Sequence, residues 1–128
     1  MNPKKILLVD DQNTVLMMER MMLRDCGFDI VTAKNGEEAV EKALAERPDL
    51  ILLDVVMPKM NGFEACRALR AREETRSIPI IMCTTRGEAT NVQEGFDAGC
   101  TDYVTKPFNA TELMGKIRLN LGSEAGSQ

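Results

Sequence analysis

Five polar side chains stand at or directly after the ends of four short apolar runs: Asp10, Asp11, Asp54, Thr84 and Lys106. Such runs are typical of parallel strands, whose carboxyl ends meet at one edge of a sheet. Three carboxylates, a hydroxyl and an ammonium would then converge in one pocket. Carboxylates this close raise each other's pKa or require a cation, and an all-oxygen site suits Mg²⁺ or, alternatively, Mn²⁺.

These groups favour one class of reaction. Lys106 can hold a phosphoryl oxygen, and Thr84 offers a hydroxyl donor on the same side. The chain has no histidine, so the usual general base at neutral pH is missing. Attack of a carboxylate on phosphorus, which makes an aspartyl phosphate, needs no such base. We expect Asp54 to be the nucleophile because it ends the most apolar run.

Each of these residues has a simpler explanation when it is taken alone. An aspartate that closes a strand is more often a turn or helix cap than a nucleophile, and Asp10 and Asp11 could cap a following helix. A single lysine is usually a surface residue. Five suitable groups at the same end of four strands would be a rare coincidence, so the joint placement favours the chemical interpretation.

The elements that must position these groups follow from the periodicity. We expect strands at residues 6–9, 28–32, 50–53, 80–83 and 103–105. Helical spacing separates them, with the fourth helix at about 88–98. The expected inward residues of the other helices are Val15, Met18, Met22 and Cys26; Ala39, Val40, Ala43 and Leu44; Phe63, Cys66 and Leu69; and Leu113, Ile117 and Leu121. Five strand–helix units predict a doubly wound α/β domain, with a parallel sheet and helices on both faces.

The length of 128 residues predicts one domain, which we place at residues 1–121, followed by a disordered polar tail at 122–128.

The segment between the first and second strands is rich in methionine. Of Met17, Met18, Met21 and Met22 we expect about two to fill the core, and we give little weight to a partner-binding surface there. The segment 72–76 is predicted to be a solvated loop.

Composition excludes several classes of function. The net charge of −4 leaves no basic stripe for phosphates, so direct nucleic-acid binding is not expected. No apolar stretch reaches the roughly 20 residues needed to insert in a membrane. The four cysteines, Cys26, Cys66, Cys83 and Cys100, form no C-x-x-C pair, so we expect buried reduced thiols in a cytoplasmic protein and no zinc site.

Five motifs carry a resemblance to a known family: Val9-Asp10-Asp11, Leu53 through Pro58, Met60-Asn61-Gly62, Cys83-Thr84 and Tyr103 through Phe108. In order and spacing they resemble the receiver domain of two-component response regulators, over about residues 4–121. The resemblance implies a flavodoxin-like fold whose five strands lie in the order 2-1-3-4-5. It also implies a phosphorylation-activated signalling switch, of the stand-alone chemotaxis or phosphorelay type, without a separate enzymatic substrate.

The resemblance assigns roles to the site. Asp54 would be the phosphoacceptor, supplied by a phosphohistidine on a sensor histidine kinase or a histidine phosphotransfer protein. Asp11, Asp54 and the backbone carbonyl of Val56 would ligate Mg²⁺, while Asp10 would act through water. Lys106 would pair with the phosphoryl group.

Further residues would transmit or modulate the signal. Thr84 and Tyr103 would be the switch pair, and the Lys106–Pro107 bond would be cis. The fourth helix, fifth strand and fifth helix would form the face that binds an unknown downstream protein. The domain would be a monomer or a weak phosphorylation-dependent dimer.

Three side chains near the expected site bear on the lifetime of a phosphoryl group. Thr85 stands where the family usually has a smaller residue, so its bulk would restrict access. Val56 and Arg86 would flank the path of the hydrolytic water. We expect Arg86 to lengthen the lifetime, so that Arg86→Ala would speed dephosphorylation.

Two other classes of function fit these motifs less well. A Mg²⁺-dependent phosphohydrolase usually has a second aspartate two residues after its nucleophile, where this chain has Val56. Multiple turnover of a small phosphate ester would support it. A flavodoxin-like cofactor binder needs a phosphate loop after the first strand, where Asp10 and Asp11 would repel phosphate. A coloured protein would support that function.

Overall fold

The computed structural model describes residues 3–55, 60–85, 89–106 and 108–121 of the chain. The strands are β1 (Lys5–Val9), β2 (Asp29–Ala33), β3 (Leu50–Asp54), β4 (Ile80–Thr85) and β5 (Asp102–Lys106). The helices are α1 (Asn13–Leu23), the short 3₁₀ helix η1 (Arg24–Cys26), α2 (Gly36–Glu46), α3 (Gly62–Arg70), α4 (Ala89–Ala98) and α5 (Ala110–Leu121).

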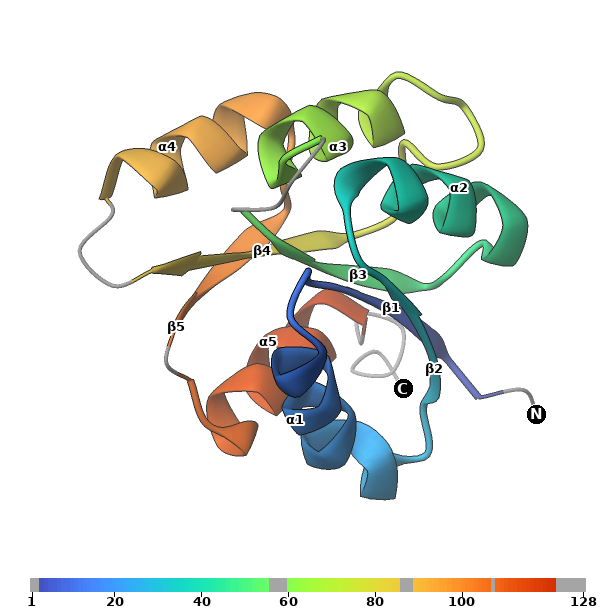
Figure 1. Ribbon diagram of the computed structural model, residues 1–128, viewed down its shortest axis with the longest axis vertical. Helices are drawn as coiled ribbons and strands as arrows, with labels where there is room; N and C mark the ends of the chain where they lie inside the picture. Colours follow the sequence, from blue (N-terminus) through green and yellow to red (C-terminus); the bar gives the residue numbers. More distant parts are fainter. Residues whose placement is uncertain (1–2, 56–59, 86–88, 107, 122–128) are drawn as a thin grey trace.

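All neighbouring strands pair in parallel, in the order β2-β1-β3-β4-β5. Helices α2, α3 and α4 cover one face of the sheet, and α1 and α5 cover the other (Figure 1). The predicted doubly wound α/β fold and its strand order are therefore confirmed. Because the strands are parallel, their carboxyl ends meet along one edge.

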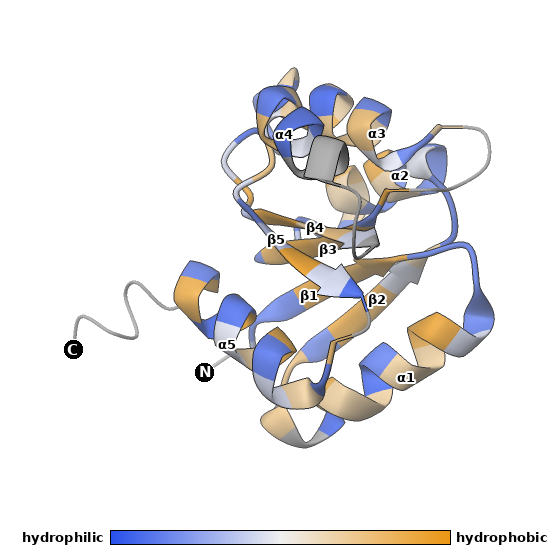
Figure 2. Cartoon of the chain, turned by 90° about the vertical axis from the view of Figure 1, so that its left-hand side faces the viewer, coloured by the Kyte–Doolittle hydropathy of each residue, from blue (hydrophilic) through white to orange (hydrophobic). Residues whose placement is uncertain are grey.

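The sheet is the centre of two apolar cores. Alternate residues of a strand point to opposite faces, so Leu7 and Val9 join one core while Ile6 and Leu8 join the other. The central strands are buried on both sides, which explains their continuous apolar runs. Figure 2 shows these hydrophobic strands lying between the two layers of helices.

Local capping fixes where several helices begin. The Asn61 side chain accepts a hydrogen bond from the backbone of Glu64, whose carboxylate accepts one from the Asn61 backbone, as the predicted cap requires. Asn109 and Glu112 make the same reciprocal pair at the start of α5. These caps hold the helix N-termini beside the strand ends.

The predicted inward face of the first helix is wrong. The residues that the helix buries are Leu16, Glu19 and Leu23, one position along from the expected Val15, Met18 and Met22. A shift of one residue rotates the buried face by about 100°. The correct phase includes a glutamate, and glutamates are seldom fully buried, so the apolar pattern favoured the neighbouring stripe.

Most of the methionines on α1 are exposed. Met17, Met18 and Met21 are 61%, 55% and 60% exposed, and Met22 is half-buried. The expectation that about two of the four would fill the core is therefore wrong. Cys26, predicted to be buried, is exposed because α1 ends at Leu23 and η1 turns the chain away.

The other cysteines agree with the sequence. Cys66, Cys83 and Cys100 are buried free thiols. Burial raises the pKa of each, to about 11 for Cys100. A thiol with a raised pKa is a poor nucleophile, so these residues act as small core side chains.

One residue of the loop after α3 is more buried than the charge pattern indicated. Thr75 is fully buried, and its hydroxyl donates a hydrogen bond of 2.6 Å to the carbonyl of Leu69. Arg70, at the end of α3, donates to the carbonyl of Gly99, the residue that follows α4. The other residues of the predicted solvated loop at 72–76 are exposed, as expected, so Thr75 is the exception.

One glycine sets the position of α3 against the site. The Gly62 amide donates a hydrogen bond to the carbonyl of Val55, and a Cβ at this position would overlap the carbonyl oxygen of Asp54. Only a residue without a side chain allows this approach. Gly62 therefore holds the end of β3 and the start of α3 together.

We predict that Gly62→Ala lowers the free energy of unfolding by roughly 1–3 kcal/mol, because the backbone of Asp54 must move. The matched control is Gly115→Ala in α5, where an added Cβ meets no atom within 4 Å. It should raise stability by about 0.5–1 kcal/mol. Urea unfolding measures both, and equal effects would contradict the account.

Candidate functional site

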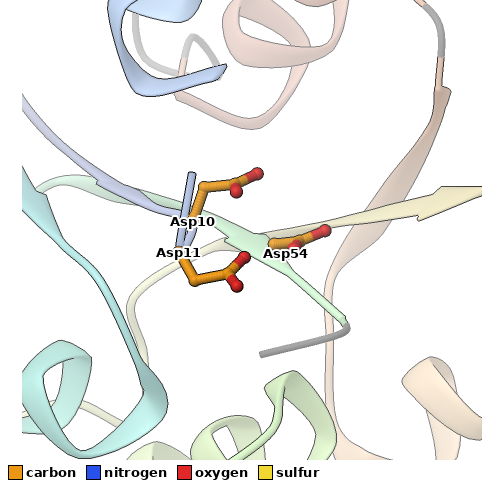
Figure 3. Close-up of side chains that lie close together, drawn as sticks. All are labelled: Asp10, Asp11 and Asp54. Carbon is orange, nitrogen blue, oxygen red and sulfur yellow. The ribbon is translucent and has the colours of Figure 1, made fainter. Parts of the chain in front are cut away.

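The polar residues expected at the sheet edge lie at the carboxyl ends of four strands. Asp10 directly follows β1, Asp54 ends β3, Thr84 lies near the end of β4, and Lys106 ends β5. The carboxyl groups of Asp10, Asp11 and Asp54 point to the same side of the strand ends (Figure 3). The predicted convergence is seen for the three carboxylates and for Lys106, which pairs with two of them.

The three carboxylates are close enough to share a cation. One oxygen from each of Asp10, Asp11 and Asp54 lies within 4.8 Å of the other two. Asp10 and Asp54 are buried, whereas Asp11 is exposed. Hard oxygen ligands with one open side fit Mg²⁺, which retains several waters when it binds proteins.

Among the described residues, Lys106 supplies the positive charge that pairs with these carboxylates. Its Nζ atom lies 3.1 Å from Oδ2 of Asp10 and 2.9 Å from Oδ1 of Asp54. The other oxygen of Asp10 accepts a hydrogen bond from the Gln12 amide, so Asp10 also has the local turn role considered above. Lys106 thereby joins the ends of β1, β3 and β5.

Burial and charge act against each other here. Burial opposes the charge on Lys106, but its hydrogen bond to Asp54 and the charges of Asp54 and Asp10 outweigh burial and raise its pKa. Burial also raises the pKa of Asp54, while the Lys106 ammonium opposes that shift. Lys106 stays protonated, and its ammonium favours the ionised form of Asp54 in this partly buried site.

Thr84 and Tyr103 lie on the opposite side of the sheet from α1. Thr84 is buried, and it faces the same side of the sheet as Met82, two residues before it. Met82 pairs with Tyr103 on the neighbouring strand, so Thr84 and Tyr103 share that face. The Tyr103 ring is half-buried. It meets Phe96 of α4 edge-on, at a centroid distance of 6.1 Å, and the Lys116 ammonium lies 5.2 Å from its centroid. The ring thus bridges α4, β5 and α5.

Several residues singled out in the sequence fall outside the part of the chain that the structure describes. They are Val56, Arg86, Pro107 and the tail 122–128. The backbone of Thr85 pairs with Lys106, but its side chain is likewise not described. Their suggested roles stay predictions.

Sequence reasoning missed Glu19. This residue of α1 is 3% exposed, and its Oε1 atom has no hydrogen-bond partner among the described residues. Burial raises its pKa from 4.5 to about 8, and the charges of Asp10 and Asp54 act in the same direction while Lys106 opposes them. The sequence does contain a second stripe at helical spacing, in which Leu16 and Leu23 lie on either side of Glu19, and this stripe could have indicated its burial.

No helix among the described residues is long and apolar enough to cross a membrane.

We predict that Glu19→Gln becomes more stable relative to the parent as pH rises. The folded parent holds the Glu19 proton up to about pH 8, whereas the unfolded chain loses it near pH 4.5. Rising pH in that window therefore costs the parent stability, on the order of a few kcal/mol, and the amide has no such cost. Urea unfolding at pH 5 and pH 8, with a chelator present, measures the difference. A gap that does not widen would contradict the burial of this carboxyl.

Comparisons with known proteins agree with the geometry. The family model described as "Response regulator receiver domain" matches residues 6–118. The alkaline phosphatase synthesis transcriptional regulatory protein PhoP of Bacillus subtilis is 41% identical over 115 residues, which are 90% of this chain and 47% of that protein. PhoB of Rhizobium meliloti, a phosphate regulon transcriptional regulatory protein, is 40% identical over 91% of this chain and 52% of its own length. The chain spans about half the length of the curated relatives it matches.

Solved structures resemble the whole described fold. The chemotaxis response regulator CheY4 of Vibrio cholerae has a TM-score of 0.87 and 38% identity, over 93% of this chain and 99% of that one. The receiver domain of the sensor histidine kinase PA1611 of Pseudomonas aeruginosa has a TM-score of 0.88 and 34% identity, over 94% and 99%. That structure holds a magnesium ion in its active-site cleft. This chain belongs to the receiver-domain family of the response regulators of two-component signalling.

Proposed function

We propose that Asp54 accepts a phosphoryl group from a phosphohistidine on a sensor kinase or a phosphotransfer protein. The chain then acts as a switch that relays the signal by protein contact, without a separate substrate. One observation carries the proposal. Asp54 ends the central strand with Asp10 and Asp11 beside it and the Lys106 ammonium 2.9 Å away.

The transfer needs few groups from this chain. A carboxylate oxygen of Asp54 attacks phosphorus in line with the departing nitrogen, the P–N bond breaks, and the donor imidazole keeps its electron pair. The Lys106 ammonium then pairs with a phosphoryl oxygen of the product. No general base is required because the attacking carboxylate is already ionised.

Asp11 and Asp54 would hold Mg²⁺ directly and Asp10 would hold it through water, as their oxygen-only donor set allows. When it is bound, the ion would neutralise the carboxylates and the phosphoryl oxygens that come together during transfer. The magnesium-bound PA1611 receiver supports this assignment by similarity. The backbone carbonyl of Val56, the remaining proposed ligand, lies outside the described residues.

The switch would run from Thr84 to Tyr103. A hydrogen bond from Thr84 and the Lys106 pair would each favour the phosphorylated packing by about 1.5–3 kcal/mol. Converting a mostly inactive population to a mostly active one takes about 5.5 kcal/mol, so the two contacts are of the required size. Movement of Thr84 would free space for the Tyr103 ring, which shares its face of the sheet.

The output face would be α4, β5 and α5. Beside Tyr103 lies a surface hollow of about 730 Å³, whose lining includes Glu112, Lys116 and Leu119. Leu119 is 71% exposed and Phe96 is 44% exposed, so this face carries apolar side chains that another protein could cover. A turn of Tyr103 would change the shape of this surface directly.

We predict that the folded protein, mixed with acetyl phosphate and Mg²⁺, gains one hydroxylamine-labile phosphoryl group by intact mass. Asp54→Asn should abolish the adduct because the amide is not a nucleophile for phosphorus. Asp29→Asn is the matched control, since Asp29 is exposed at the opposite edge of the sheet. An adduct that persists in Asp54→Asn would refute the assignment.

Tyr103 is the only tyrosine and the chain has no tryptophan, so tyrosine fluorescence reports this ring alone. We predict that Mg²⁺ with beryllofluoride, a phosphoryl mimic, changes this fluorescence. Thr84→Val should remove the change, because it keeps the shape but lacks the hydroxyl. A response that is unaltered in Thr84→Val would show that the ring does not follow Thr84.

A further inference from the structure

We propose that Glu19 is a positioning residue, whose buried carboxyl group receives the Lys106 ammonium when a divalent cation binds at Asp10, Asp11 and Asp54. Glu19 thereby lets the cation displace Lys106 without leaving a buried charge unpaired. The inference rests on the proposed magnesium site and assigns that site a residue from α1.

Glu19 and Lys106 line the same cavity. It lies between α1 and the segment that follows β5, and its volume is about 480 Å³. Its other walls include the apolar side chains of Val15, Met22 and Phe108. Among the described residues of this lining, Glu19 is the only acidic side chain and Lys106 the only basic one, and Oε1 of Glu19 has no hydrogen-bond partner.

The present partners of Lys106 are the same carboxylates that would bind the cation. Its Nζ atom lies 3.1 Å from Asp10 and 2.9 Å from Asp54. A divalent ion on those oxygens would repel an ammonium at this distance, and both charges could not keep their places. Cation binding therefore includes the cost of moving Lys106.

That cost depends on where the ammonium goes. A lysine side chain is long and flexible, so its end can turn into the adjoining cavity. Without an acceptor, an ammonium among apolar walls would be strongly unfavourable. The unpartnered oxygen of Glu19 supplies that acceptor on the α1 side. It also explains why a helix face that is otherwise apolar retains a glutamate.

Calorimetric titration of Mg²⁺ tests the proposal with Glu19→Gln and Glu19→Met, each in the parent and in the Lys106→Ala background. In the parent background we expect about tenfold weaker binding for Glu19→Met, and a smaller loss for Glu19→Gln, which keeps an uncharged acceptor. In the Lys106→Ala background neither change should alter the affinity. Met18→Leu, on the wall of the same cavity, is the matched control and should bind Mg²⁺ as the parent does.

Other outcomes would overturn the proposal in separable ways. Unchanged affinity in both Glu19 variants would show that Lys106 does not need this acceptor. An equal loss in both backgrounds would show a general attraction between Glu19 and the cation, without Lys106. A parent that binds no Mg²⁺ would refute the proposed metal site itself. Both Glu19 variants remove an unpartnered buried carboxyl, so we expect them to stay folded.

Discussion

The structure depends on one ammonium group placed between two buried carboxylates. Lys106 bonds to Asp10 and Asp54, and these contacts join the ends of three strands that are far apart in the sequence. Carboxylates at this spacing and burial would repel one another without a cation. A divalent cation or a phosphoryl group can therefore replace the contacts of Lys106. A switch requires such an exchange between two sets of contacts.

The proposed displacement of Lys106 would affect both faces of the sheet. On the α1 side, the apolar cavity and Glu19 adjoin Lys106, so a displaced ammonium has an acceptor. On the other side, Thr84 lies in the same packed layer as Tyr103, whose ring contacts α4 and α5. A change of charge at the strand ends can thus reach the exposed surface through short, contiguous contacts rather than through a wholesale change of fold.

Much of the fold and of the site could be predicted from the sequence, because the patterns that indicate them are local and repeated. Continuous apolar runs predicted the strands, and the polar residue after each run predicted the shared edge where Asp54 and Lys106 meet. The strand order came from the family resemblance, since periodicity alone does not say which strands are neighbours. The face of α1 was misjudged because its core phase buries Glu19, and the burial of Thr75 depends on a contact that a charge pattern does not reveal.

The most direct test of the account is nuclear magnetic resonance of the backbone amides during titration with beryllofluoride. With Mg²⁺ present, we expect the resonances of Asp10, Asp54, Thr84 and Lys106 to change and the resonance of Tyr103 to change with the same midpoint. Without Mg²⁺, or in the Asp54→Asn variant, these changes should be absent. Changes that occur without Mg²⁺, or that leave the ends of β3 and β5 unaffected, would contradict it.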